Sequence, residues 1–231
     1  MLQRIVTSTI GLGVVALIAV PPAAAQQTLN VTIGQFAPLG EDARVAGDVL
    51  NVNRTFLLFD HEQFDSPSIG AEWLIPLGDF VEAGAGVSVS RRTVASVYQD
   101  FVDSDGTEID QDLRLRLVPL AFTIRLLPLG QFSPVQPYVG AGLGIVNWRY
   151  SETGEFVDFG AGNEIFRDAF TANGSVTAPI VLGGIRFAGR RASVGGEVRY
   201  QKGEADLDDQ FAGSKLDLGG WTYNVTLGVR F

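Results

Sequence analysis

The sequence contains a single histidine, His61, whose neighbours include side chains that support acid–base or nucleophilic chemistry: Asp60, Glu62, Asp65, Ser66 and Ser68. A histidine paired with a serine hydroxyl and a carboxylate can activate that hydroxyl as a nucleophile. A lone histidine among acidic loop residues is more commonly just solvated, and the sequence lacks a Gly-x-Ser-x-Gly motif, zinc-ligand spacing and a phosphate-binding loop. We therefore predict no catalytic, cofactor or metal site, with a lipid-modifying enzyme using His61 as a weak alternative.

A second set of charged side chains recurs at alternate positions of otherwise apolar segments: Glu72, Glu82, Arg125, Arg186, Glu197, Arg199 and Arg230. Alternate residues of a β-strand face opposite sides, so these charges share one face with Gly and Ser while Val and Leu occupy the other. Isolated buried charges are costly, so we expect the Glu and Arg residues to pair. The pattern predicts an interior lined throughout by polar residues and a structural charge network, with a narrow gated ion path as the alternative.

Alternation of period two predicts eight strands, at about 29–38, 66–77, 80–98, 112–127, 135–150, 174–187, 192–202 and 216–231. The last strand is the clearest, because every second position is apolar or aromatic: Trp221, Tyr223, Val225, Leu227, Val229 and Phe231. Polar residues fill the positions between them. In a soluble sheet the apolar face would be a core, whereas in an outer-membrane barrel it meets lipid and the polar face meets the lumen.

The strand at 112–127 changes its pattern midway. Leu113, Leu115 and Leu117 are odd-numbered, whereas the apolar residues after Pro119 are even-numbered. Proline cannot donate a ladder hydrogen bond, so a bulge near Pro119 could switch the face. The alternative is a regular strand with Arg114 and Arg116 pointing outward at the level of the lipid headgroups, and the sequence does not decide between the two.

The predicted connections alternate in length. Short ones span 78–79, 128–134 and 188–191, and long, acidic ones span 39–65, 99–111, 151–173 and 203–215. Outer-membrane barrels place short turns in the periplasm and long loops outside, so both ends of the barrel are expected in the periplasm. The apolar stretch 54–59 in the first loop predicts an extended strand, a short helix over the mouth, or a hairpin that would give ten strands.

The first 25 residues have the features of a secretory signal peptide. Arg4 is followed by an apolar run to Val20 and by small residues, with cleavage expected between Ala25 and Gln26. A transmembrane helix is the alternative, although about 20 apolar residues are needed to span a bilayer. We predict a signal peptide at 1–25 and one domain at 26–231. Cleavage removes one Arg and no acid, taking the formal net charge from −9 to −10, which disfavours nucleic acid as a partner.

Several segments resemble a known family, the outer-membrane β-barrel domain family of small OmpA/OmpX- and OmpW-like barrels: Leu117-Val118-Pro119, Leu127–Gly130, Gln136–Gly142 and Gly219–Phe231. The resemblance covers about Asn30 to Phe231. It implies an all-β, eight-stranded antiparallel up-and-down transmembrane barrel in the outer membrane of a Gram-negative cell. The terminal Phe231 and its alternating partners resemble the signal read by the barrel-assembly machinery.

These observations lead to one functional expectation. Eight strands enclose an interior that side chains can fill, so a wide porin is not expected. We predict a structural or surface-interaction role with a polar-filled lumen and acidic extracellular loops, and a conduit for small hydrophobic molecules or ions as the alternative. Expected partners are outer-membrane lipid and lipopolysaccharide, with the assembly machinery and periplasmic chaperones during biogenesis, and the barrel is expected to be a monomer.

Overall fold

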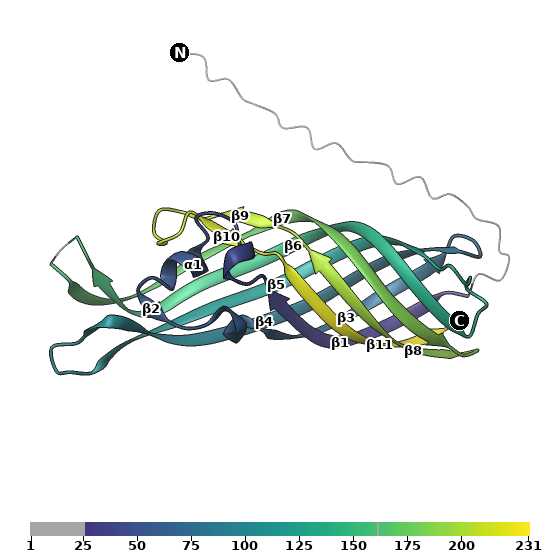
Figure 1. Cartoon of the computed structure of the whole chain (residues 1–231), viewed down its shortest axis with the longest axis horizontal. Coiled ribbons are helices and arrows are strands. Elements are labelled where there is room, and N and C mark those ends of the chain that lie inside the picture. Colours follow the sequence, from purple (N-terminus) through teal and green to yellow (C-terminus); the bar gives the residue numbers. More distant parts are fainter. Residues whose placement is uncertain (1–25, 161) are drawn as a thin grey trace, which may run out of the picture.

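The computed structural model describes residues 26–160 and 162–231. The predicted signal peptide lies outside the described residues, which begin at Gln26. Eight strands make up the body of the molecule (Figure 1): β1 (Thr28–Pro38), β3 (Ser66–Pro76), β4 (Val81–Val102), β5 (Glu108–Leu126), β6 (Val135–Asp158), β7 (Glu164–Ala188), β8 (Ala192–Gln201) and β11 (Gly220–Arg230). No helix within the described residues is long and apolar enough to cross a membrane.

The eight strands close into a ring. Each pairs antiparallel with its neighbours in chain order, and β11 returns to β1 through pairs from Thr28↔Arg230 to Pro38↔Gly220. The predicted eight-stranded up-and-down barrel is confirmed. The ten-strand alternative is wrong, because the apolar stretch in the first loop forms only the two-residue β2 (Leu57–Leu58), which pairs with β4 beyond the end of β3.

The two ends of the barrel differ. At the turn end, short connections cover 77–80, 127–134 and 189–191, and Gln27 lies beside Phe231. At the loop end, the connections 39–65 and 202–219 contain small elements: η1 (Glu41–Ala43), α1 (Val49–Asn53), β2, η2 (His61–Phe64), β9 (Glu204–Asp206) and β10 (Lys215–Asp217). The other two connections at this end, 103–107 and 159–163, are brief.

Strand length divides the ring into two walls. The strands β1, β3, β8 and β11 have 10 or 11 residues, whereas β4 to β7 have 19 to 25. Hairpins β4–β5 and β6–β7 therefore reach farther out than the rest of the loop end (Figure 1). The predicted loops 99–111 and 151–173 are wrong for this reason. Both segments are mainly paired strand, and their outward acidic residues gave them the composition of loops.

The outer surface carries a continuous apolar band around the turn-end part of the barrel. Its exposed side chains include those of Val31, Ile33, Ile69, Phe122, Ile124, Val139, Leu143, Val181, Val225 and Leu227. Aromatic residues lie near both edges, with Trp73 and Phe231 toward the turn end and Tyr200 packed on Trp221 toward the loop end. An apolar belt with aromatic borders is typical of a transmembrane barrel and would be a liability in water.

The strand β5 keeps its register past Pro119, and the register shift in its pairing with β4 lies at the loop end, between Val97 and Val102. Its pairing with β6 runs without a shift from Gln111↔Gly154 through Pro119↔Val146 to Leu126↔Val139. The bulge considered near Pro119 is therefore absent from this pairing, and Arg114 and Arg116 point outward.

The barrel interior at the loop end is mainly apolar, with a few buried polar side chains among the apolar ones. We call this the loop-end core, and it includes Val49, Leu50, Val94, Ile109, Leu113, Leu115, Leu117, Val146, Trp148 and Tyr150. The prediction of a polar interior throughout is therefore wrong above the apolar band. Outside the bilayer a barrel is surrounded by water, so its interior is the only place left to bury apolar side chains.

Candidate functional site

The lower interior holds a cluster of paired charges, which we call the lumenal charge cluster: Glu72, Glu82, Arg125, Arg186, Glu197 and Arg199. They project inward from five strands. The lumen is faced by the even-numbered residues of β3, β4 and β7 and by the odd-numbered residues of β5 and β8. Glycines at inward positions of the neighbouring strands leave room for these side chains. A Cβ on Gly140 would lie 2.6 Å from the backbone oxygen of Ile124 and 3.1 Å from Cγ of Arg125, so a larger residue there would collide with the backbone.

Arg125 is the centre of the cluster. Its Nη2 atom lies 2.6 Å from each carboxylate oxygen of Glu72 and 2.8 Å from Oε2 of Glu197. Its Nη1 atom is 3.8 Å from Glu82, and the guanidinium carbon lies 4.8 Å from the centre of the Tyr138 ring. One buried arginine thus links three carboxylates from three strands.

The other two arginines of the cluster neutralise the remaining carboxylate charge. Arg186 donates to Glu82 at 2.9 Å and to Gln136 at 2.7 Å, and Arg199 donates to Glu197 at 2.8 Å. Three carboxylates and three guanidinium groups therefore brace opposite walls of the barrel. A cavity of only ≈ 20 Å³ lies beside Arg199, so the cluster fills the lumen at this level.

Arg230 lies outside this cluster, contrary to the prediction. Its guanidinium donates to the backbone carbonyl of Gly189 at 2.8 Å, in the turn that follows β7. Arg230 is the last residue of β11 and so lies at the turn end, where it also donates to the backbone carbonyl of Gln131 at 3.5 Å. A residue can therefore share the inward face with the cluster and still bond to the backbone of the turns instead of to the carboxylates.

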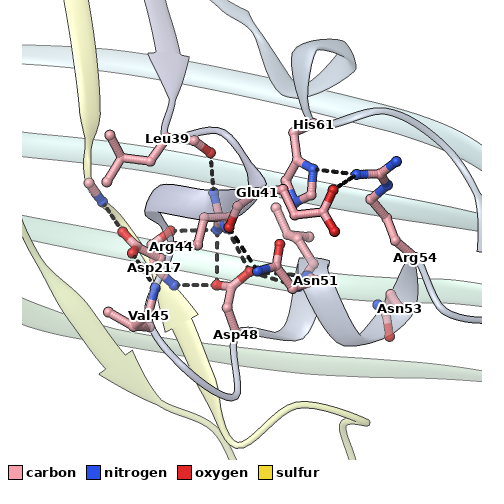
Figure 2. Close-up of polar contacts among 12 residues, drawn as sticks. Leu39, Glu41, Arg44, Val45, Asp48, Asn51, Asn53, Arg54, His61 and Asp217 are labelled. Carbon is pink, nitrogen blue, oxygen red and sulfur yellow. Dashed lines mark hydrogen bonds and ion pairs between the residues drawn. The ribbon is translucent and has the colours of Figure 1, made fainter.

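A buried ion pair locks the first loop to the last (Figure 2). Arg44 Nε lies 2.6 Å from Asp48 Oδ1, and both side chains are fully buried. Asp48 Oδ2 accepts from the backbone N–H of Asp217 at 2.7 Å, and the Asp217 carboxylate accepts from Val45 N–H at 3.0 Å. We call these residues the loop lock. It fastens segment 39–65 to segment 202–219 across 169 residues of sequence.

The loop lock also places α1 over the barrel mouth. Asp48 caps this helix by accepting from the N–H groups of Leu50 and Asn51 at 3.1 and 3.2 Å. Val49 and Leu50 are then fully buried in the loop-end core. The helix lies just before the apolar stretch 54–59, which itself forms the short strand β2 beside β4, as in the extended-strand alternative.

His61 is buried at the start of η2 and packs near the ring of Phe59. Its Nδ1 atom is 3.3 Å from Arg54 Nη1, and its Nε2 atom has no hydrogen-bond partner among the described residues (Figure 2). Burial lowers the pKa of His61, and Arg44 and Arg54 lower it further, which favours the neutral imidazole. No serine hydroxyl or carboxylate in the described residues is hydrogen-bonded to the ring, so Ser66 and Ser68 form no nucleophile pair with it.

A buried carboxyl group near the mouth was missed by the sequence reasoning. Glu152 of β6 is 4% exposed and accepts from Asn53 at 2.6 Å, Tyr150 at 2.8 Å and Gln111 at 3.3 Å. Within the part of the chain that the structure describes, no ion pair includes it. Burial raises the pKa of Glu152, while these three hydrogen bonds lower it.

Glu152 lies at the base of an open aromatic pocket of ≈ 430 Å³. We call it the mouth pocket, and its walls include Phe56, Tyr98, Phe156, Phe159, Phe166 and Phe170. The rings are mutually packed, with Phe156 and Phe170 4.9 Å apart between centroids. Gln111, 3% exposed, also lines the pocket, and its Oε1 atom has no partner among the described residues. The sequence did contain a signal for Glu152. It follows Trp148 and Tyr150 at the next alternate position, and these two residues face inward.

The alternating residues of the last strand all face outward. Their side chains are exposed on the apolar band: Trp221, Tyr223, Val225, Leu227, Val229 and Phe231. The backbones of Phe231 and Gln27 exchange hydrogen bonds of 2.8 and 3.0 Å, which extends the seam between β1 and β11. Recognition of this strand by the assembly machinery stays a prediction.

No family model and no curated protein matches this chain. Several solved structures are similar to it, among them the following three. The attachment invasion locus protein Ail of Yersinia pestis, in complex with the heparin analogue sucrose octasulfate, is 11% identical, with 90% of this chain and 99% of that chain covered and a TM-score of 0.45. Neisserial surface protein A is 11% identical, with 89% and 97% covered and a TM-score of 0.47. The N-terminal β-barrel domain of Pseudomonas aeruginosa OprF is 12% identical, with 89% and 97% covered and a TM-score of 0.35. As the sequence predicted, the similar solved structures are small outer-membrane β-barrel proteins of the OmpA/OmpX-like type.

Proposed function

We propose that this barrel lies in the outer membrane of a Gram-negative cell, with its turn end in the periplasm and its loop end outside. The apolar band and its aromatic borders support membrane insertion. Short turns at one end and large connections at the other support this orientation, since outer-membrane barrels keep their short turns in the periplasm.

The orientation can be tested by labelling, because the chain has no cysteine. Ser104 lies in the β4–β5 connection at the loop end, and Ser133 lies in the turn between β5 and β6. A membrane-impermeant maleimide added to intact cells is expected to label Ser104→Cys and to spare Ser133→Cys. Labelling of Ser133→Cys alone would reverse the orientation, and labelling of both only after lysis would place the protein elsewhere.

The proposed function is surface interaction through the loop end, with a closed lumen below. The observation that carries it is the platform built above the apolar band. Four long strands, an internal apolar core and the loop lock hold this region in one arrangement, and the mouth pocket opens from it. A barrel that only stabilised the membrane would not need a folded region with its own apolar core outside the membrane.

The chemistry of the mouth pocket favours a particular kind of ligand. Aromatic faces attract cations and apolar groups, and the Glu152 carboxyl and the free Gln111 oxygen accept hydrogen bonds. A ligand group that combines an apolar body with an ammonium would satisfy all of these. Basic aromatic or aliphatic side chains of another protein have this chemistry.

A small-molecule probe tests the pocket. The full chain in lipid nanodiscs is titrated with phenethylammonium, and binding is followed by NMR shifts of the probe. We expect saturable binding that is lost in Glu152→Gln and retained in Glu164→Gln, a control that changes an exposed acid at the tip of the same β6–β7 hairpin. Absence of saturable binding, or equal binding by both variants, would contradict this role of the pocket.

A conduit for ions or small hydrophobic molecules is the competing function. The lumenal charge cluster favours a closed lumen, because its six charges bond to one another across the interior. In planar bilayers we expect no conductance steps above the lipid baseline. Discrete steps that disappear in a variant of Arg125 would establish a conduit instead.

A further inference from the structure

Four arginines form a patch on the outer surface of the long-strand wall. Arg91 of β4 is directly opposite Arg116 of β5, and Arg116 is directly opposite Arg149 of β6. Arg114 lies two residues from Arg116 on the same face, and all four side chains are exposed. We call this patch the arginine row.

The arginine row is unfavourable for the isolated protein. Side chains directly opposite in an antiparallel pair have Cβ atoms about 5 Å apart, and like charges at that distance repel. None of the ion pairs among the described residues includes any of the four arginines. Their one side-chain hydrogen bond is from Arg114 Nε to the Thr93 hydroxyl at 3.0 Å. A repulsive row without protein counter-ions indicates that an anion comes from outside the chain.

The position of the row specifies the source of that anion. On the same face of β5, the residues next toward the turn end are Val118 and Leu120, where the apolar band begins, and Asp112 follows on the other side. The guanidinium groups therefore lie at the border of the band, at the depth of lipid headgroups. On the short-strand wall, the corresponding border holds Tyr200 and Trp221 instead.

We propose that the arginine row binds the phosphate groups of a lipid in the leaflet at the loop end. Guanidinium groups bind phosphate oxygens through two parallel hydrogen bonds, and they lose less hydration than ammonium groups. Two strand-to-strand steps of about 4.8 Å separate Arg91 from Arg149, so the row is long enough for two phosphates. The chain carries a formal charge of −9, so a general attraction to anions does not account for the patch. If the proposed orientation holds, this lipid is the phosphorylated glycolipid of the outer leaflet.

The test uses the full chain in phosphatidylcholine nanodiscs with and without lipid A that carries two phosphates. The readout is the temperature at which the folded, fast-migrating gel band is lost. We expect lipid A to raise this temperature for the wild type. In Arg116→Gln/Arg149→Gln the lipid A concentration required for the same stabilisation should rise at least about tenfold, because two guanidinium groups that would bond to phosphate are lost.

A matched control removes two arginines from the turn end, Arg190 and Arg191. The variant Arg190→Gln/Arg191→Gln is expected to respond to lipid A as the wild type does. Free inorganic phosphate and dephosphorylated lipid A are expected to have no effect on any form. Without lipid A, Arg116→Gln/Arg149→Gln should be at least as stable as the wild type, because it loses repulsion.

Three results would overturn the proposal. They are an absence of stabilisation by lipid A, an equal response from both double variants, and an equal effect from dephosphorylated lipid A. Stabilisation by free phosphate would mean that the row binds a soluble anion instead of a lipid. Nanodiscs present lipid A on both faces, so this result does not depend on the orientation, which the cysteine labelling tests separately.

Discussion

The two halves of β5 have opposite patterns. Toward the turn end, Arg125 lies inside and Ile124 outside, whereas toward the loop end Leu113 lies inside and Arg114 outside. The pairing of β5 with β6 keeps one register through both halves. What differs is the surroundings of the outer face, which are lipid in one half and water in the other. Strand pairing therefore determines which residues face inward. Whether the outer face meets lipid or water then determines whether apolar residues lie outside or inside.

The largest expected effect is in the lower half. Arg125→Met removes the closest cation of Glu72 and one of the two cations that lie 2.8 Å from Glu197, so we expect a loss of about 3–5 kcal/mol in the free energy of unfolding. Urea unfolding of the refolded barrel, followed by tryptophan fluorescence, measures it. Arg114→Met on the outer face of the same strand is the control and should cost little. Equal losses in the two variants would mean that the buried network does not stabilise the barrel.

The loop lock should break locally. Asp48→Ala leaves Arg44 buried without its carboxylate and removes the cap of α1, so opening of segment 39–65 should become easier by about 3 kcal/mol. Limited proteolysis of intact barrels measures the opening. Asp60→Ala is the control, since its ion pair with Arg54 is long, at 3.8 Å, and exposed. Cleavage at the same rate in both variants would contradict the lock.

In the loop-end core, Leu113→Ala creates a cavity at a fully buried position, and we expect it to cost about 2–4 kcal/mol. Leu120→Ala on the lipid face of the same strand should cost less, because lipid fills the space that the side chain leaves. The same urea experiment compares them. A greater loss in Leu120→Ala would show that the upper interior is not a packed core.

The mouth pocket should respond to pH. The raised pKa of Glu152 means that the folded chain holds this proton to a higher pH than the unfolded chain, whose carboxyl titrates near 4.5. Its stabilising contribution is therefore complete below about pH 4.5 and is lost as pH rises through the folded pKa. Thermal unfolding between pH 4.5 and 8 should show a smaller decline in Glu152→Gln than in the wild type. An identical pH profile in the two proteins would contradict the prediction.

The smallest effect is expected on the surface. Lys215 and Glu204 form an ion pair of 2.9 Å between β10 and β9, but both are substantially exposed. Lys215→Gln should leave the unfolding midpoint unchanged within error, because water and salt screen such pairs. A clear loss would mean that β9 and β10 contribute to closing the mouth more than their exposure suggests.

The eight-stranded ring could be predicted from the sequence, but the region above the apolar band could not. Alternation in segments such as 221–231 predicts strands directly, because each has one apolar face. The same rule failed for 99–111 and 151–173, where water on the outside reverses the pattern and acidic residues imitate a loop. Six charges of the lumenal cluster were found through their shared face, but alternation does not encode that Arg230 bonds to the backbone of the turns instead. Asp48 and Glu152 depend on contacts between distant segments, so no local pattern marks them.

The seam between β1 and β11 has a consequence for how the barrel is made. Its two strands are the first and last of the ring in chain order, yet they pair along 11 positions. Until β11 is in place, β1 and β8 each present a row of unpaired peptide groups, which lipid cannot satisfy. Formation of the ring is therefore a late event of very high contact order, and such non-local closure is slow. The chain therefore needs protection from aggregation until the ring has closed. A small deletion within Gly220–Arg230 would leave every earlier strand intact but the barrel open.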